Sequence, residues 1–195
     1  MLMACAAAGM IIGIVTKTGV GLKLASVLVG MANGNEIILL FCTMLTSLIL
    51  GMGVPTTANY VITSTIAAPA LIGLGVPILA AHMFVFYFGI IADITPPVAL
   101  AAYAGAAISG GDPLKTGVNA SKLGIAAFIV PYVFVLSPAL LGIHASAGQV
   151  IMTTITALIG MVGISSAMIG YLYRRLNAIE RLIIFAAGLC LIDPE

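Results

Sequence analysis

Residues 51–60 read GMGVPTTANY and separate two short apolar segments of the chain. The segment before them, residues 36–50, would rise about 22 Å as a helix, less than the roughly 30 Å of a bilayer core. Pro55 cannot continue a helix, and the two glycines favour unwound backbone. The segment after them, residues 58–74, is again short and ends in a Gly-Val-Pro turn. We therefore expect a re-entrant helical hairpin over residues 36–74.

The next apolar run, residues 80–108, is long enough to cross a bilayer but is interrupted near its middle by DITPP at residues 93–97. This interruption predicts a discontinuous transmembrane helix. Unwound backbone persists in hydrocarbon only where protein covers it or where it lines a wet cavity. Secondary transporters build their ion and substrate sites near the midplane from such elements. The sequence therefore favours a carrier.

The composition indicates an all-α integral membrane protein. Hydrophobic residues make up 62 % of the chain, charged residues 7 %, and the mean hydropathy is +1.26, whereas a soluble domain has about 25 % charged residues. A net charge of +1 gives no basic surface for nucleic acid. The chain lacks the GxxxxGK[ST], HExxH and GxSxG patterns, so we expect no enzymatic activity and no cofactor.

We expect three regions along the chain. Residues 1–35 predict a partial transmembrane helix followed by a connecting or arm helix. Residues 36–108 contain the hairpin and the discontinuous helix, and residues 109–195 predict scaffold-like transmembrane helices. The positive-inside rule places the basic turns of this last region in the cytoplasm, which makes the hairpin open to the exterior. The residues that carry this inference are Lys115, Lys122, Arg174, Arg175 and Arg181.

The tip and the break offer the oxygen atoms that hard cations prefer. At the tip, threonine and asparagine side chains are cation ligands, caps of the second arm, or both at once. At the break, Asp93 is an intramembrane carboxylate, and the alternatives for it are ion ligand, proton carrier and hydrogen-bonded structural group. Two successive prolines also leave carbonyls one turn earlier without their helical donors. The candidate binding residues are Gly51, Gly53, Pro55, Thr56, Thr57, Asn59, Asp93, Thr95, Pro96 and Pro97.

Several of these blocks resemble a known family. GMGVPTTANY (51–60), ITPPVALAAYA (94–104) and VPYVFVLSPALL (130–141) are similar to the large membrane subunit, of DctM type, of tripartite ATP-independent periplasmic (TRAP) transporters. The resemblance is strongest to the form in which the small and large membrane subunits are fused. The closing stretch, from Ile155 through GYLYRRLNAIERLIIFAAGLCLIDPE, resembles the tail of those fused permeases.

The resemblance implies one repeat of an elevator-type fold, like that of the ion transporter superfamily, in which a mobile transport domain slides against a scaffold. It implies sodium-driven uptake of organic acids, of the dicarboxylate or carboxylate class, in a bacterial or archaeal cytoplasmic (inner) membrane. A periplasmic solute-binding protein would deliver the substrate. One Na⁺ site would lie near Thr56, Thr57, Asp93 and Thr95.

The family has two such repeats, whereas this sequence shows one hairpin and one broken helix. We therefore expect a C-terminal portion whose partners are the missing N-terminal half and the small membrane subunit or its fused equivalent. The alternative is a non-transporting membrane scaffold module or a truncated remnant, in which the tip and the break are packing features.

Overall fold

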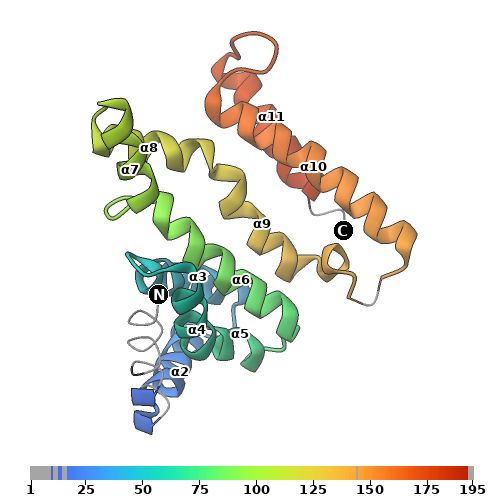
Figure 1. Cartoon of the computed structure of the whole chain (residues 1–195). Coiled ribbons are helices and arrows are strands. Elements are labelled where there is room, and N and C mark those ends of the chain that lie inside the picture. Colours follow the sequence, from blue (N-terminus) through green and yellow to red (C-terminus); the bar gives the residue numbers. More distant parts are fainter. Residues whose placement is uncertain (1–9, 11–12, 15–16, 144, 193–195) are drawn as a thin grey trace.

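The computed structural model describes residues 10, 13–14, 17–143 and 145–192, and the regular elements within these ranges are all helices (Figure 1). The prediction of an all-α chain is confirmed. The apolar segment expected at the start of region 1–35 falls mostly on residues outside this description. The described part of that region contains helix α2 (Val20–Ala32).

The hairpin consists of three helices, one in its first arm and two in its second. α3 (Glu36–Gly51) begins where the Asn35 side chain accepts hydrogen bonds from the backbone N–H groups of Ile37 and Ile38. The second arm is divided into α4 (Thr56–Ile66) and α5 (Ala68–Gly73). The division follows from Pro69, which has no N–H to continue the ladder of α4.

Helix α6 (Ile78–Ile91) lies at the centre of the hairpin region and packs against α3, α4, α5 and α9. It continues into the 3₁₀ turn η1 (Ala92–Ile94), and the chain becomes helical again in α7 (Leu100–Ser109). Phe84 and Phe88 are fully buried, and both stack edge-on against Tyr132 of α9 with ring centroids 5.3 and 5.8 Å apart. We call α3–α7 the hairpin–break unit.

Helix α8 (Pro113–Leu123) begins at Asp112, whose carboxylate accepts a hydrogen bond from the Lys115 backbone N–H at 2.9 Å. It is followed by α9 (Ile125–Leu136) and the short 3₁₀ helix η2 (Pro138–Leu141). α8 and α9 meet at Gly124 with a bend of 41°. Together they are long and apolar enough to cross a membrane, if the bent pair counts as one span.

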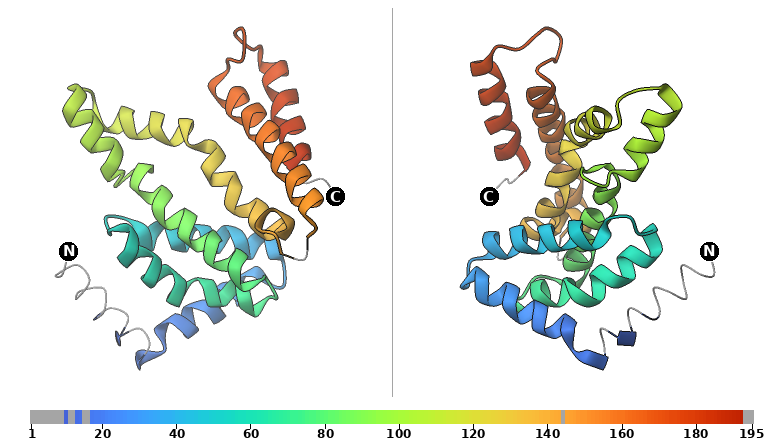
Figure 2. Two further views of the ribbon diagram at one scale, coloured as in Figure 1. Left: turned by 45° about the vertical axis from the view of Figure 1, so that its right-hand side comes forward. Right: turned by 90° about the vertical axis from the view of Figure 1, so that its left-hand side faces the viewer.

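Helices α10 (Ala147–Ile169) and α11 (Ala178–Ile192) form a closely packed pair (Figures 1 and 2). A Cβ atom on Gly160 would stand 2.7 Å from the Gly188 carbonyl oxygen, so only glycines allow this approach. Within the described ranges, α10 is the one unbroken helix that meets the length and hydropathy of a membrane span. Small residues at helix contacts are typical of membrane proteins.

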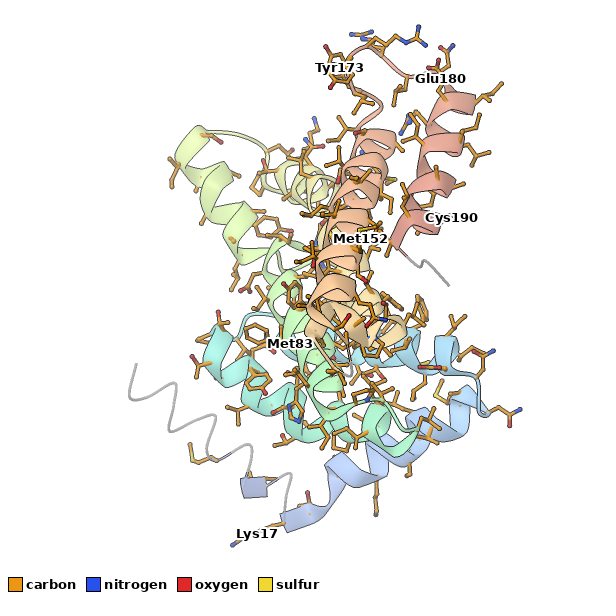
Figure 3. The ribbon with its side chains drawn as sticks, turned by 90° about the vertical axis from the view of Figure 1, so that its right-hand side faces the viewer. Lys17, Met83, Met152, Tyr173, Glu180 and Cys190 are labelled. Atoms are coloured by element: carbon orange, nitrogen blue, oxygen red, sulfur yellow. The ribbon has the colours of Figure 1, made fainter. Side chains whose placement is uncertain are left out.

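The turns alternate between the two ends of the molecule. The α7–α8 corner and the α10–α11 turn lie at the upper end of Figures 1 and 2, and Figure 3 places Tyr173 and Glu180 there. The α5–α6 connection and η2 lie lower, and Lys17 is at the bottom. The α7–α8 corner and the α10–α11 turn, which contains Arg174 and Arg175, therefore lie at the same end of the molecule.

Candidate functional site

The tip of the hairpin is unwound over residues 52–55. α3 ends at Gly51, Met52 is extended, and Gly53 has a φ of 74°, a left-handed conformation that glycine adopts without strain. Pro55 precedes α4 and has no backbone N–H of its own. The predicted interruption of the hairpin at its Gly/Pro sequence is thus present.

The discontinuous helix is interrupted over residues 92–99. The α-helical pattern ends at Ile91, and the Pro96–Pro97 peptide bond is cis. Ala99 has a φ of 37°, after which α7 begins. The predicted break at ITPP is present, and it occupies the middle of the run between α6 and α7.

The tip and the break lie beside each other. A Cβ atom on Gly51 would stand 2.6 Å from the carbonyl oxygen of Gly89, so the end of α3 touches the backbone of α6 one turn before Asp93. A Cβ atom on Gly53 would stand 3.9 Å from Cγ1 of Val98. η1 also packs against α3. The two unwound segments, which are about 40 residues apart in sequence, therefore form one region.

Asn59 fills the space where α3, α4 and α6 meet. Its side chain is 1 % exposed and lies between two glycines. A Cβ atom on Gly89 would stand 2.7 Å from Asn59 Oδ1, and one on Gly51 would stand 2.9 Å from Asn59 Nδ2. Oδ1 has no hydrogen-bond partner in the described part of the chain. This amide oxygen is thus buried between α3 and α6 without a hydrogen-bond donor among the described residues.

The threonines at the tip differ from Asn59. Thr56 and Thr57 begin α4 with exposed side chains. The residue at the N-cap position is Pro55, and among the described residues no side chain caps this helix. The alternative that threonine and asparagine cap the second arm is therefore wrong.

Asp93 and Thr95, both at the break, differ in their hydrogen bonding. Oδ1 of Asp93 is buried and has no hydrogen-bond partner within the described ranges. The Thr95 hydroxyl donates to the Ile91 carbonyl at 2.8 Å, although its oxygen keeps lone pairs that can bind a cation. In a continuous helix the Asp93 carbonyl would accept a hydrogen bond from the backbone N–H of residue 96 or 97. Both residues are prolines, which have no N–H.

The structure supplies partners to other carbonyls around the prolines. The Ala92 carbonyl accepts the Thr95 N–H at 3.2 Å. The Ile94 carbonyl accepts the Ser121 hydroxyl at 2.9 Å, and the Pro97 carbonyl accepts the Tyr103 hydroxyl at 2.8 Å. Of the two carbonyls that lose their helical donors to the prolines, that of Ala92 is therefore satisfied by a turn, while Ile94 and Pro97 receive side-chain donors from α8 and α7.

Comparison with known protein families identifies the family of this chain. Residues 1–149 match the model described as "Tripartite ATP-independent periplasmic transporter, DctM component". The chain belongs to the DctM family. Searches of curated proteins and of solved structures found no match.

Membership of the DctM family establishes the general class. The chain is a permease component of a TRAP transporter, a non-enzymatic membrane protein. Such a component works with a periplasmic binding protein and a small membrane subunit, and the family belongs to the bacterial inner membrane. The matched residues include the whole hairpin–break unit and α8 and α9.

Sequence reasoning missed a polar stripe in this DctM-family chain. Thr43 and Ser47 of α3 are fully buried, and their hydroxyl oxygens have no hydrogen-bond partner among the described residues. Thr63 of α4 is buried as well and donates to the Asn59 carbonyl at 2.9 Å. The signal was available, because Thr43, Ser47 and Gly51 recur every four residues and so share one face of the helix.

Proposed function

We propose that the hairpin–break unit supplies a Na⁺ site in a sodium-coupled TRAP permease that takes up organic acids. One observation carries this proposal. Asn59 Oδ1 at the tip and Asp93 Oδ1 at the break are both buried and both without a hydrogen-bond partner among the described residues. A buried polar oxygen left unpaired costs about 1–3 kcal/mol, and a bound cation would offset that cost.

The type of oxygen favours a hard cation. An amide oxygen, a carboxylate, a threonine hydroxyl and backbone carbonyls bind hard cations well. The break provides Asp93 and Thr95, and the tip provides Asn59. Thr56 and Thr57, which are exposed here, complete the site in our proposal when the tip moves toward the break. Gly51, Gly53, Pro55, Pro96 and Pro97 keep the backbone open for this purpose.

The site also needs a second repeat. Within the described residues there is one hairpin–break unit, and the inverted-repeat carriers place substrate and ions between two. We infer that the other unit faces this one and that the organic acid binds between them. Residues 36–108 then belong to the moving transport domain, and residues 109–195 belong to the scaffold against which it slides.

The proposal is tested by Na⁺ binding to the purified complete transporter, measured with ²²Na⁺ by scintillation proximity, so that the substrate need not be known. Asp93→Asn removes the charge and is expected to weaken Na⁺ binding at least about tenfold, because a charged ligand is worth about 1.5–3 kcal/mol. Glu36→Gln is the matched control, since Glu36 is an exposed carboxylate at the start of α3. Equal Na⁺ affinity in both variants would contradict the site and favour the non-transporting scaffold.

A further inference from the structure

Helix α8 is bonded directly to the break through Ser121. The Ser121 hydroxyl donates to the Ile94 carbonyl at 2.9 Å and lies 3.1 Å from the Gly117 carbonyl of its own helix. Ile94 stands between Asp93 and Thr95 in the chain. The bond therefore fixes the Ile94–Thr95 peptide unit, which lies between these two candidate ligands.

Gly117 brings the backbone of α8 against the same segment. A Cβ atom there would stand 3.2 Å from Tyr103 Cε1, 3.3 Å from Pro96 Cγ and 3.4 Å from Ala99 Cβ. The first two distances are tighter than most contacts, so an alanine here would require Tyr103 or Pro96 to shift by a few tenths of an ångström. The Tyr103 hydroxyl in turn donates to the Pro97 carbonyl at 2.8 Å.

Pro96 lies at an open groove rather than in a closed core. The groove has a volume of about 280 Å³, and its other lining residues come from α8, α9 and α10. The lining is apolar, with Val118, Ile125, Phe128 and Met168 among its side chains. On this side the position of Pro96 depends on its contact with α8 rather than on a filled core.

We propose that α8 clamps the break and that Ser121 and Gly117 are positioning residues for the candidate Na⁺ site. Neither residue binds the ion. They hold the Asp93–Thr95 backbone in place beside the hairpin tip, and α8 continues through Gly124 into α9, so the clamp also ties the site to the following helices. The inference rests on the proposed function for its ion, but its mechanical part is tested without one.

The test uses a single reporter thiol in the complete transporter. Val98→Cys is introduced after Cys5, Cys42 and Cys190 are replaced, because Val98 belongs to the break and its side chain lies against Gly53 of the tip. The rate of labelling by a water-soluble thiol reagent is measured in Na⁺-free buffer. Ser121→Ala removes the bond to Ile94 and is expected to speed labelling about two- to tenfold, the effect of one hydrogen bond on an opening equilibrium.

Two further variants make the result specific. Gly117→Ala is expected to speed labelling as well, whereas Gly105→Ala of α7 is its matched control, because no described atom lies within 4 Å of a Cβ at that position. Ser121→Thr keeps the hydroxyl and is expected to retain the parent rate. Identical rates in Ser121→Ala, Gly117→Ala and Gly105→Ala would overturn the clamp, and Gly117→Ala decides the matter if Ser121→Ala fails to assemble.

Repeating the labelling with Na⁺ separates the two proposals. Na⁺ is expected to slow labelling of the parent reporter, and Ser121→Ala is expected to raise the Na⁺ concentration that gives half protection. If Na⁺ does not slow labelling of the parent reporter but Ser121→Ala still speeds labelling, the ion site is rejected and the clamp is kept. If Na⁺ slows labelling of the parent but Ser121→Ala labels at the parent rate, the clamp is rejected and the ion site is kept.

Discussion

The hairpin–break unit and the α10–α11 pair differ in how their backbone hydrogen bonds are satisfied. The pair is built from a helix of 23 residues and a helix of 15 residues that meet through Gly160 and Gly188. The hairpin–break unit consists of helices of 6 to 16 residues, with unwound backbone at the tip and at the break, around buried polar side chains such as Asn59 and Thr63. An unbroken helix satisfies its own backbone, whereas an interrupted one leaves oxygens for another partner.

In both regions glycine allows two helices to approach closely, but the two contacts differ in what surrounds them. Glycine allows close helix contact at Gly51–Gly89 and again at Gly160–Gly188. At the first contact the approach also confines the Asn59 amide beside the tip. At the second, the described residues bring apolar atoms of Ile192 and Ile164 against the glycines. Only the first contact is therefore expected to matter for a bound ion.

The largest expected effect comes from filling these two glycine contacts. Gly51→Ala would place a Cβ 2.6 Å from a backbone oxygen, and Gly160→Ala would place one 2.7 Å from another. Each is expected to lower the free energy of unfolding by about 1–3 kcal/mol, as overpacking does, seen as a lower melting temperature in detergent. Gly51→Ala alone is expected to weaken ²²Na⁺ binding in the folded fraction.

Gly30→Ala on α2 is the control for both substitutions, because no described atom lies within 4 Å of the added Cβ. If Gly160→Ala lowered Na⁺ affinity as much as Gly51→Ala, the two regions would be one functional unit and the comparison would fail.

A smaller effect is expected from the buried polar side chains. Asn59→Leu keeps the side chain's bulk and removes the free amide oxygen, so we expect Na⁺ affinity to fall about tenfold, the worth of about 1.4 kcal/mol. Ser166→Ala is the matched change in α10, where the hydroxyl donates to the Val162 carbonyl at 2.5 Å. Ser166→Ala should leave Na⁺ affinity unchanged. If Asn59→Leu bound Na⁺ with wild-type affinity, the Asn59 amide would not be a ligand of the site.

The smallest effect separates two threonines of α3. Thr43 is buried and its hydroxyl has no partner among the described residues, whereas Thr46 donates to the Cys42 carbonyl at 2.9 Å. Thr43→Val should therefore be neutral or stabilise the protein by up to about 1 kcal/mol, and Thr46→Val should destabilise it by a similar amount. Melting temperatures of the two variants measure the difference. A destabilised Thr43→Val would show that this hydroxyl has a partner in the assembled transporter.

The sequence by itself determined where the helices stop. Pro55, Pro77 and the Pro96–Pro97 pair lack backbone donors, and a helix ends a few residues before each of them, whereas Pro131 lies inside α9. Asp112 followed by Pro113 has the chemistry of a helix start, and α8 begins there. The hydropathy determined the membrane class, because a chain with 7 % charged residues has too little polar surface for water.

The tertiary structure decided which oxygens are free. Asn59 and Thr56 are three residues apart in one motif, yet one is buried between two glycines and the other is exposed. Ser121 lies far along the chain from the break and still occupies the Ile94 carbonyl. Periodicity and propensity report what a residue does within its own helix, whereas hydrogen-bond partners from other helices depend on how the elements pack. Local chemistry therefore determined where the helices are interrupted. Packing determined which oxygen atoms at these interruptions have no hydrogen-bond partner and, in our proposal, can bind an ion.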